Sequence, residues 1–148
     1  MKLKEDLIKR FETDQKYSGR NVAKAEEIYR ENSLWLERVI DEIGWPSQDI
    51  VGIVGEQSAW LIVQHSPDLD FQERCLKMIK DLPLTNERKE YMAYLTDRIL
   101  VRKGYQQIFG TQFLNGKPFP IKEFENLDVK RKEVGLEPFE DYQKRMQK

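Results

Sequence analysis

Two residue types that carry much of the chemistry of enzymes are almost absent from this sequence. Its 148 residues include one histidine, His65, and one cysteine, Cys75. A tetrahedral structural zinc site takes its ligands mostly from these two types, so such a site is excluded. A single cysteine cannot form an internal disulfide, which favours a reducing compartment. We interpret Cys75, which lies among Phe71, Leu76 and Ile79, as a small buried hydrophobic residue.

Long apolar runs and an excess of one charge are absent as well. No apolar run approaches the roughly 20 residues that a membrane-spanning helix needs, and the charged segment 1–6 lacks the apolar region of a signal peptide. The 25 basic and 26 acidic residues nearly cancel, so nothing draws the chain towards nucleic acid or an anionic membrane. We therefore expect a soluble, cytoplasmic protein with no nucleic-acid and no membrane partner.

The common nucleotide-binding and hydrolase motifs are also missing. The sequence contains no Walker loop, no G-x-G-x-x-G and no G-x-S-x-G elbow. Asp68 and Asp70 leave a carboxylate-bound Mg²⁺ or Ca²⁺ open, although the segment is too short for an EF-hand loop. We predict no cofactor and assign no metal ligand.

What the sequence does contain is helical periodicity. Apolar residues recur at helical spacing, and turn residues divide the chain into six to seven helices. The predicted helices span residues 3–16, 21–43, 48–65, 71–80, 87–102, 126–134 and a last segment that starts at 137–138. Asn115-Gly116 is a strong hairpin turn, so we expect one small β-hairpin near residues 105–121. A chain of this length suits one core, and we predict a single, mainly α-helical domain over residues 1–148.

Polar residues just before three of these helices predict how the helices begin. The hydroxyl of Ser47 is expected to cap the third helix. Asp68 or Asp70 is expected to cap the fourth helix, and Thr85 or Asn86 the fifth.

His65 is the first candidate for function. In the third predicted helix it ends a stripe formed by Ile50, Val54, Ser58 and Leu61, so it should point along an apolar face. An imidazole exchanges protons near neutral pH, which makes it a candidate general base or acid. The alternative is that a cationic imidazole only neutralises the exposed carbonyl groups at the helix end.

Asp97 and Arg98 are the second candidates, because they lie inside the most apolar of the predicted helices. Adjacent helix residues point in different directions, so each buried charge needs its own partner. The candidate partners of Asp97 are His65 and Arg131. The candidate partners of Arg98 are Asp68, Asp70 and an anionic ligand. Either these residues close a structural ion-pair network, or Asp97 orients the imidazole while Arg98 holds a carboxylate or phosphate.

A set of glutamines forms the third candidate group. Its members are Gln57, Gln64, Gln72, Gln106, Gln107 and Gln112. Buried amides need hydrogen-bond partners, so these groups either satisfy one another or bind a polar ligand. Gly110-Thr111 beside Gln112 would allow a close approach to the backbone.

Several short motifs follow one another in a recognisable order. They are Gly44-Trp45-Pro46, Trp60 to His65 with the Asp68/Asp70 pair and Phe71-Gln72, Ala93 to Arg98, Gln107 to Gln112, Lys130 to Leu136, and Tyr142. In this order they resemble an uncharacterised, mainly bacterial domain family of unknown function, over about residues 30–143. The resemblance implies a shared site of His65, Asp97, Arg98 and Gln112, and it implies no activity. The sequence departs from the family pattern at Pro67, which precedes the first aspartate, and at Phe109, which replaces a tyrosine.

We therefore predict a polar pocket around His65 that binds a small polar or anionic ligand. If it supports hydrolase or transferase chemistry, His65 and Asp97 are the catalytic residues. The predicted ligand-binding residues are Gln64, Asp68, Asp70, Gln72, Arg98, Thr111 and Gln112. The alternative is a protein-binding module of the immunity or adaptor type, which would use Lys130, Arg131 and Tyr142. A third alternative is a scaffold whose polar cluster only stabilises the fold.

Overall fold

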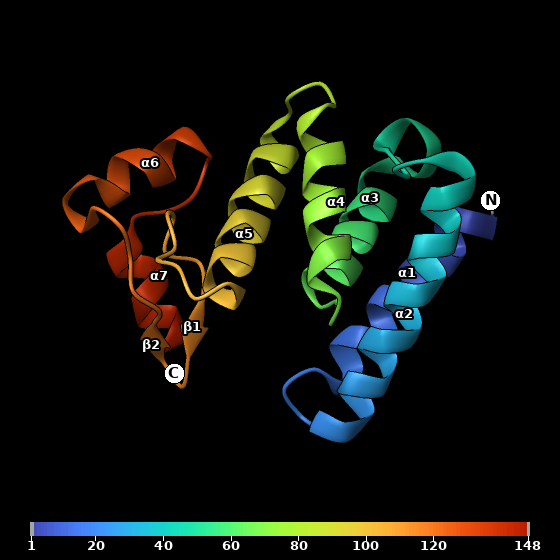
Figure 1. Ribbon diagram of the computed structural model, residues 1–148, viewed down its shortest axis with the longest axis horizontal. Helices are drawn as coiled ribbons and strands as arrows, with labels where there is room; N and C mark the ends of the chain where they lie inside the picture. Colours follow the sequence, from blue (N-terminus) through green and yellow to red (C-terminus); the bar gives the residue numbers. More distant parts are fainter. Residues whose placement is uncertain (1, 148) are drawn as a thin grey trace. The chain divides into compact units, whose positions relative to one another are not determined.

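Helices make up most of the structure. The computed structural model describes residues 2–147. Within that range the chain forms seven α-helices, one 3-10 helix and one two-stranded hairpin (Figure 1). Their bounds are α1 (Lys2–Tyr17), α2 (Val22–Ile43), α3 (Gln48–Gln64), α4 (Leu69–Lys80), α5 (Asn86–Arg102), β1 (Phe113–Leu114), β2 (Lys117–Pro118), η1 (Phe124–Asn126), α6 (Leu127–Glu133) and α7 (Phe139–Met146). The predicted fold class, mainly α-helical with one small hairpin, is confirmed.

The chain divides into two compact units inside α4. The first unit ends at Cys75 and the second begins at Leu76. Each unit is described here by itself, and the single domain over residues 1–148 stays a prediction.

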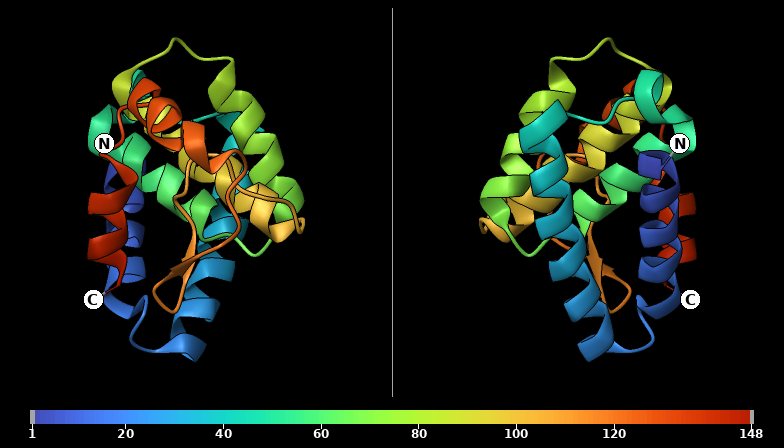
Figure 2. Two further views of the ribbon diagram at one scale, coloured as in Figure 1. Left: turned by 90° about the vertical axis from the view of Figure 1, so that its left-hand side faces the viewer. Right: turned by 90° about the vertical axis from the view of Figure 1, so that its right-hand side faces the viewer.

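In the first unit, α1, α2 and α3 pack against one another. Figure 2 shows α1 and α2 running in opposite directions on either side of the turn that joins them. The side chain of Asn21 begins α2 by accepting a hydrogen bond from the backbone N–H of Lys24 at 3.0 Å. The buried apolar residues of this unit are Leu7, Ala25, Ile28, Leu36, Ile40, Trp45, Val51, Ala59, Ile62, Val63, Phe71 and Cys75.

Helix α3 is interrupted at Gly52, which has a φ of +76°. This left-handed conformation is one that residues with a side chain rarely adopt. The predicted apolar stripe assumed one continuous helix, and its first half is wrong: Ile50 and Val54 are 42% and 52% exposed. Beyond the interruption, the buried residues of α3 include Gly55, Ala59, Ile62 and Val63.

The three predicted helix caps had different outcomes. Asp68 Oδ1 accepts from the backbone N–H of Phe71, and Thr85 Oγ1 accepts from that of Arg88, both at 3.1 Å. Those two caps are confirmed. The cap by the Ser47 hydroxyl is wrong, because Ser47 makes no such bond. The carboxylate of Glu56 accepts from the backbone N–H of Gln48 at 2.7 Å instead.

In the second unit, α7 packs against α6 and against β2. The hairpin turns at Asn115 and Gly116, whose φ angles of +52° and +77° are those of a type I′ turn. Its strands have two residues each, so most of the region 105–121, where the hairpin was expected, is loop. The buried apolar residues of this unit are Ile79, Tyr91, Ala93, Leu95, Ile99, Leu127, Phe139 and Tyr142.

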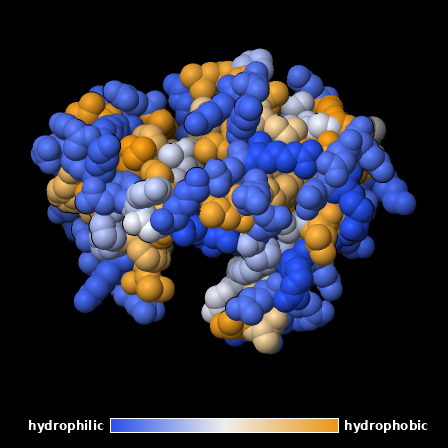
Figure 3. Space-filling model, viewed as in Figure 1, coloured by the Kyte–Doolittle hydropathy of each residue, from blue (hydrophilic) through white to orange (hydrophobic). Residues whose placement is uncertain are grey.

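Polar residues cover most of the face shown in Figure 3, with smaller apolar patches between them. Within residues 2–147, none of the helices combines the length and the apolar character that crossing a membrane requires.

Candidate functional site

The carboxylate of Asp97, on α5, organises the polar interior of the second unit. Its Oδ1 atom accepts from the backbone N–H groups of Ile108 and Phe109 at 2.8 and 3.0 Å. Its Oδ2 atom accepts from the backbone N–H and the hydroxyl of Thr111 at 3.0 and 2.8 Å. Burial raises the pKa of Asp97, and these donors oppose that rise. Asp97 therefore shapes the loop 107–112, and neither His65 nor Arg131 is among its hydrogen-bond partners in the described part of the chain.

The side chain of Gln107 ties the same loop to the segment that follows the hairpin. Its Nε2 group donates to the carbonyl oxygens of Gln112 and Phe119 at 3.0 and 2.9 Å. Its Oε1 atom accepts from the backbone N–H of Gln112 at 2.9 Å. The side-chain amide is fully buried, and both its N–H group and its oxygen form hydrogen bonds with the backbone. Gln107 is therefore a structural residue.

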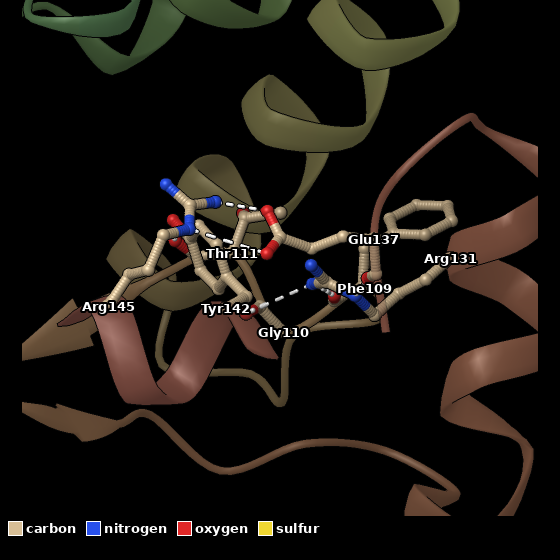
Figure 4. A network of polar contacts seen from close by, with 7 residues as sticks. All are labelled: Phe109, Gly110, Thr111, Arg131, Glu137, Tyr142 and Arg145. Atoms are coloured by element: carbon tan, nitrogen blue, oxygen red, sulfur yellow. Dashed lines mark hydrogen bonds and ion pairs between the residues drawn. The ribbon is translucent and has the colours of Figure 1, made fainter. Parts of the chain in front are cut away.

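Arg131, on α6, also holds the loop (Figure 4). Its Nε group donates to the carbonyl of Glu137 and its Nη1 group to the carbonyl of Phe109, both at 2.7 Å. The Tyr142 hydroxyl donates to the carbonyl of Thr111 at 3.1 Å, and burial lowers the pKa of Arg131. Arg131 and Tyr142 are only 1% and 7% exposed. Backbone carbonyl groups of the fold thus hold both side chains. The alternative of a protein-binding module that uses Lys130, Arg131 and Tyr142 stays a prediction.

A cavity of about 300 Å³ opens beside this network. We call it the α5 cavity, and its lining residues are Arg98, Val101, Arg102, Gln112, Phe113 and Phe119. Gln112 Nε2 donates to Thr111 Oγ1 at 3.0 Å, and Arg98 Nη1 donates to Gln112 Oε1 at 3.3 Å. A continuous chain of hydrogen bonds thus runs from Asp97 through Thr111 and Gln112 to Arg98. Two guanidinium groups and an oriented amide, set among apolar side chains, suit an anion with an apolar body.

His65 belongs to the first unit, where it is the residue that ends α3. Its Nδ1 atom lies 2.7 Å from Asp14 Oδ2, and its ring centroid lies 4.6 Å from that of Tyr29. The side chain of His65 is 18% exposed, whereas that of Asp14 is 1% exposed. A buried carboxylate on one ring nitrogen is the arrangement that orients a histidine for proton transfer. The sequence did not predict Asp14, which lies 51 residues earlier on α1.

The comparisons with known proteins identify a family. A model described as "Family of unknown function (DUF6624)" matches residues 14–148. The chain belongs to this family. No curated protein and no solved structure matches the chain. The family resemblance inferred over about residues 30–143 is confirmed, and the matched region extends to Asp14, the partner of His65.

In this DUF6624 protein, three further predicted ligand residues lie around the turn between α3 and α4. Asp68 caps α4, as described above, and Asp70 is exposed in the first turn of that helix. Gln72 is fully buried, and its Nε2 group donates to the carbonyl oxygens of Val63 and Gln64 at 3.0 and 3.1 Å. These contacts satisfy carbonyl groups at the end of α3, so Asp68 and Gln72 have roles in the fold.

The nine predicted site residues therefore fall into two groups. Gln64, His65, Asp68, Asp70 and Gln72 belong to the first unit, and Asp97, Arg98, Thr111 and Gln112 are brought together in the second. One pocket shared by all nine residues stays a prediction. Across residues 2–147, no three histidine, cysteine, aspartate or glutamate side chains are grouped so that they could hold a metal ion.

Proposed function

We propose that this protein binds a small anionic ligand with an apolar body, and that the α5 cavity is the binding site. The observation that carries the proposal is the hydrogen-bond chain that starts at buried Asp97 and ends at Arg98 in the cavity wall. The charged and apolar side chains that line the cavity determine the class of ligand.

The charge of the cavity selects an anion. Arg98 and Arg102 lie four residues apart on α5, so their side chains extend from the same side of the helix. A guanidinium group binds a carboxylate or a phosphate through two parallel hydrogen bonds, which are stronger than bonds between neutral groups. Both side chains line the cavity, so they can act on one ligand.

The walls and the size of the cavity select the rest of the ligand. Val101, Phe113 and Phe119 provide apolar contacts. A volume of about 300 Å³ is at the lower end of the usual range for small-molecule pockets and equals roughly ten times the share of one water molecule in liquid water. A monocyclic aromatic carboxylate has suitable size and chemistry.

The chain of hydrogen bonds lowers the cost of binding. Thr111 donates to Asp97, and the same hydroxyl oxygen accepts from Gln112, so the amide oxygen of Gln112 is directed at Arg98. Side chains held in one conformation before binding lose less entropy when the ligand arrives.

Calorimetric titration with benzoate, benzamide and acetate tests this proposal. Benzamide has the ring without the charge, and acetate has the charge without the ring. We expect benzoate to bind at least about tenfold more tightly than either, since each half of the molecule contributes contacts. The Arg98→Met variant should lose most of this affinity, whereas Lys117→Met, which removes an exposed cation outside the cavity lining, should bind as the wild type does. Equal affinity for benzoate and benzamide would refute the proposal.

The contact between His65 and Asp14 favours a second candidate function, general-base catalysis in a hydrolase or transferase reaction. When Nδ1–H donates to the Asp14 carboxylate, the other ring nitrogen carries the lone pair that accepts a proton. Hydrolysis of p-nitrophenyl acetate by wild type, His65→Gln and Asp14→Asn tests it. We expect both variants to remain folded and to lose activity by about 10²-fold. Unchanged hydrolysis in His65→Gln rules this candidate out.

We further propose a cytoplasmic location in a bacterial cell. The proposal is based on the single cysteine and the family likeness. Fractionation of cells that carry a tagged full-length protein tests it, and recovery from the membrane or the medium would contradict it.

A further inference from the structure

A second cavity lies between α1 and α2, in the first unit. Its volume is about 220 Å³. We call it the α1–α2 cavity, and its lining residues are Asp6, Lys9, Arg10, Thr13, Ile28, Glu31 and Asn32. The two helices that carry its lining residues run antiparallel to each other (Figure 2). Its four residues on α1 precede the family match, which begins at residue 14, and none of its residues takes part in the sites described above.

Asn32 supplies the first observation that points to a ligand. The residue is 4% exposed, and its Oδ1 atom accepts from Arg10 Nη1 at 2.9 Å. Because an arginine side chain has donors only, this contact decides which end of the amide faces Arg10. The Nδ2 group at the other end is buried and makes no hydrogen bond within the described residues. A buried amide donor without an acceptor is costly, and the residue that carries this donor lines the cavity.

The charged residues of the cavity supply the second observation. Arg10 is held in place over the ring of Trp35, with 4.2 Å between its Cζ atom and the ring centroid. Burial lowers the pKa of Arg10, while the carboxylates of Asp6 and Glu31 oppose that effect. Neither carboxylate makes a hydrogen bond or an ion pair with a described residue. The cavity therefore offers donors and acceptors of opposite charge within one small volume.

We propose that the α1–α2 cavity binds a small zwitterion, such as a free α-amino acid. The carboxylate of the ligand accepts from Asn32 Nδ2, Arg10 and Lys9, and its ammonium group donates to Asp6 and Glu31. A simple anion would leave both carboxylates unpaired, and a simple cation would leave the Asn32 amide without an acceptor. A volume of about 220 Å³, roughly seven times the share of one water molecule in the liquid, suits a small amino acid.

The side-chain amide resonances of Asn32 in a ¹⁵N–¹H spectrum report directly on this binding. The probes are L-alanine, acetate and methylammonium, added separately to the full-length protein. We expect L-alanine to shift the Asn32 amide pair in a saturable manner, with an affinity at least about tenfold higher than that of either half-molecule. If acetate binds as tightly as L-alanine, or if no probe moves these resonances and the group binds water only, the proposal is wrong.

Matched variants separate a binding role from a structural one. Asn32→Asp retains the acceptor for Arg10 but replaces the unpaired donor by a second acceptor, so L-alanine affinity should fall by about tenfold or more. Glu31→Gln changes an exposed residue of the cavity rim and should weaken L-alanine binding without altering the fold. Glu26→Gln, an exposed change on the same helix outside the cavity lining, should leave it unchanged. If Glu31→Gln and Glu26→Gln bind L-alanine equally well, the ammonium site does not exist.

Discussion

A single carboxylate, that of Asp97, receives hydrogen bonds from Ile108, Phe109 and Thr111. In Asp97→Asn, the new amide nitrogen faces N–H and O–H groups that it cannot accept from. We expect this substitution to reduce the free energy of unfolding by about 2–4 kcal/mol, because buried donors lose their acceptor. Urea denaturation measures the change. Asp81→Asn, at an exposed position, is the control and should change it by less than about 0.5 kcal/mol.

The same residue predicts a pH dependence. Burial raises the pKa of Asp97 in the folded protein above its value in the unfolded chain. The stability that Asp97 contributes is therefore fully present below the ordinary carboxyl range and is lost as the pH rises through the raised pKa. Over that range, the advantage of wild type over Asp97→Asn in unfolding free energy should shrink with rising pH. An advantage that grows with pH would mean that the hydrogen-bond donors outweigh burial and would contradict the prediction.

Cys75 offers a chemical test of the core of the first unit. Its thiol is fully buried, and burial raises its pKa to about 12. Since the thiolate is the reactive form, iodoacetamide should alkylate the folded protein very slowly at mildly alkaline pH and the urea-unfolded protein rapidly. Mass spectrometry of quenched samples gives both rates. Fast alkylation of the folded protein would show that the thiol is accessible.

At the scale of elements, the segment before the hairpin explains the largest difference between sequence and structure. Between Tyr105 and Phe113, apolar residues alternate with glutamines, a pattern typical of a strand in the hairpin expected near residues 105–121. The backbone N–H groups of 108, 109 and 111 bind Asp97 instead of a neighbouring strand. An alternating sequence pattern cannot show that a carboxylate on α5 will accept hydrogen bonds from these N–H groups.

Gly110 is the residue that lets this loop form. Its φ is +67°, and a Cβ atom there would lie 2.9 Å from a ring carbon of Phe139. Gly110→Ala should lower the free energy of unfolding by about 2–4 kcal/mol through both backbone strain and the clash. Gly104→Ala is a matched control, because Gly104 also has a positive φ, +84°, but has open space around it. If the two variants lose the same stability in urea denaturation, the contact with Phe139 contributes nothing.

Helix boundaries could be read from the sequence because the residues that set them are neighbours in the chain. Asp68, Thr85 and the Asn115-Gly116 turn act on backbone groups within three residues of themselves. The interruption of α3 could not be predicted in the same way. A glycine is tolerated inside a continuous helix as well as at a break, so Gly52 alone does not distinguish the two.

For the molecule as a whole, the residues of the candidate sites were easier to predict than their partners. His65, Asp97, Arg98 and Gln112 stand out by residue type and position. Their contacts depend on distant segments: Asp14 lies 51 residues from His65. Helical periodicity also continues without interruption through α4, where the boundary between the two units falls. No local sequence pattern therefore indicates that His65 contacts Asp14, or that the boundary between the two units lies in α4.

The central claim is that the α5 cavity binds an anion through Arg98 and Gln112. The most direct measurement is a titration of the full-length protein with benzoate, followed by the side-chain N–H resonances of these two residues. We predict that the Arg98 Nε–H and Gln112 Nε2 signals shift together, with one dissociation constant equal to that from calorimetry. In Arg98→Met the shift of Gln112 should be lost. If both signals stay in place while benzoate binds, the ligand occupies another site and the claim is wrong.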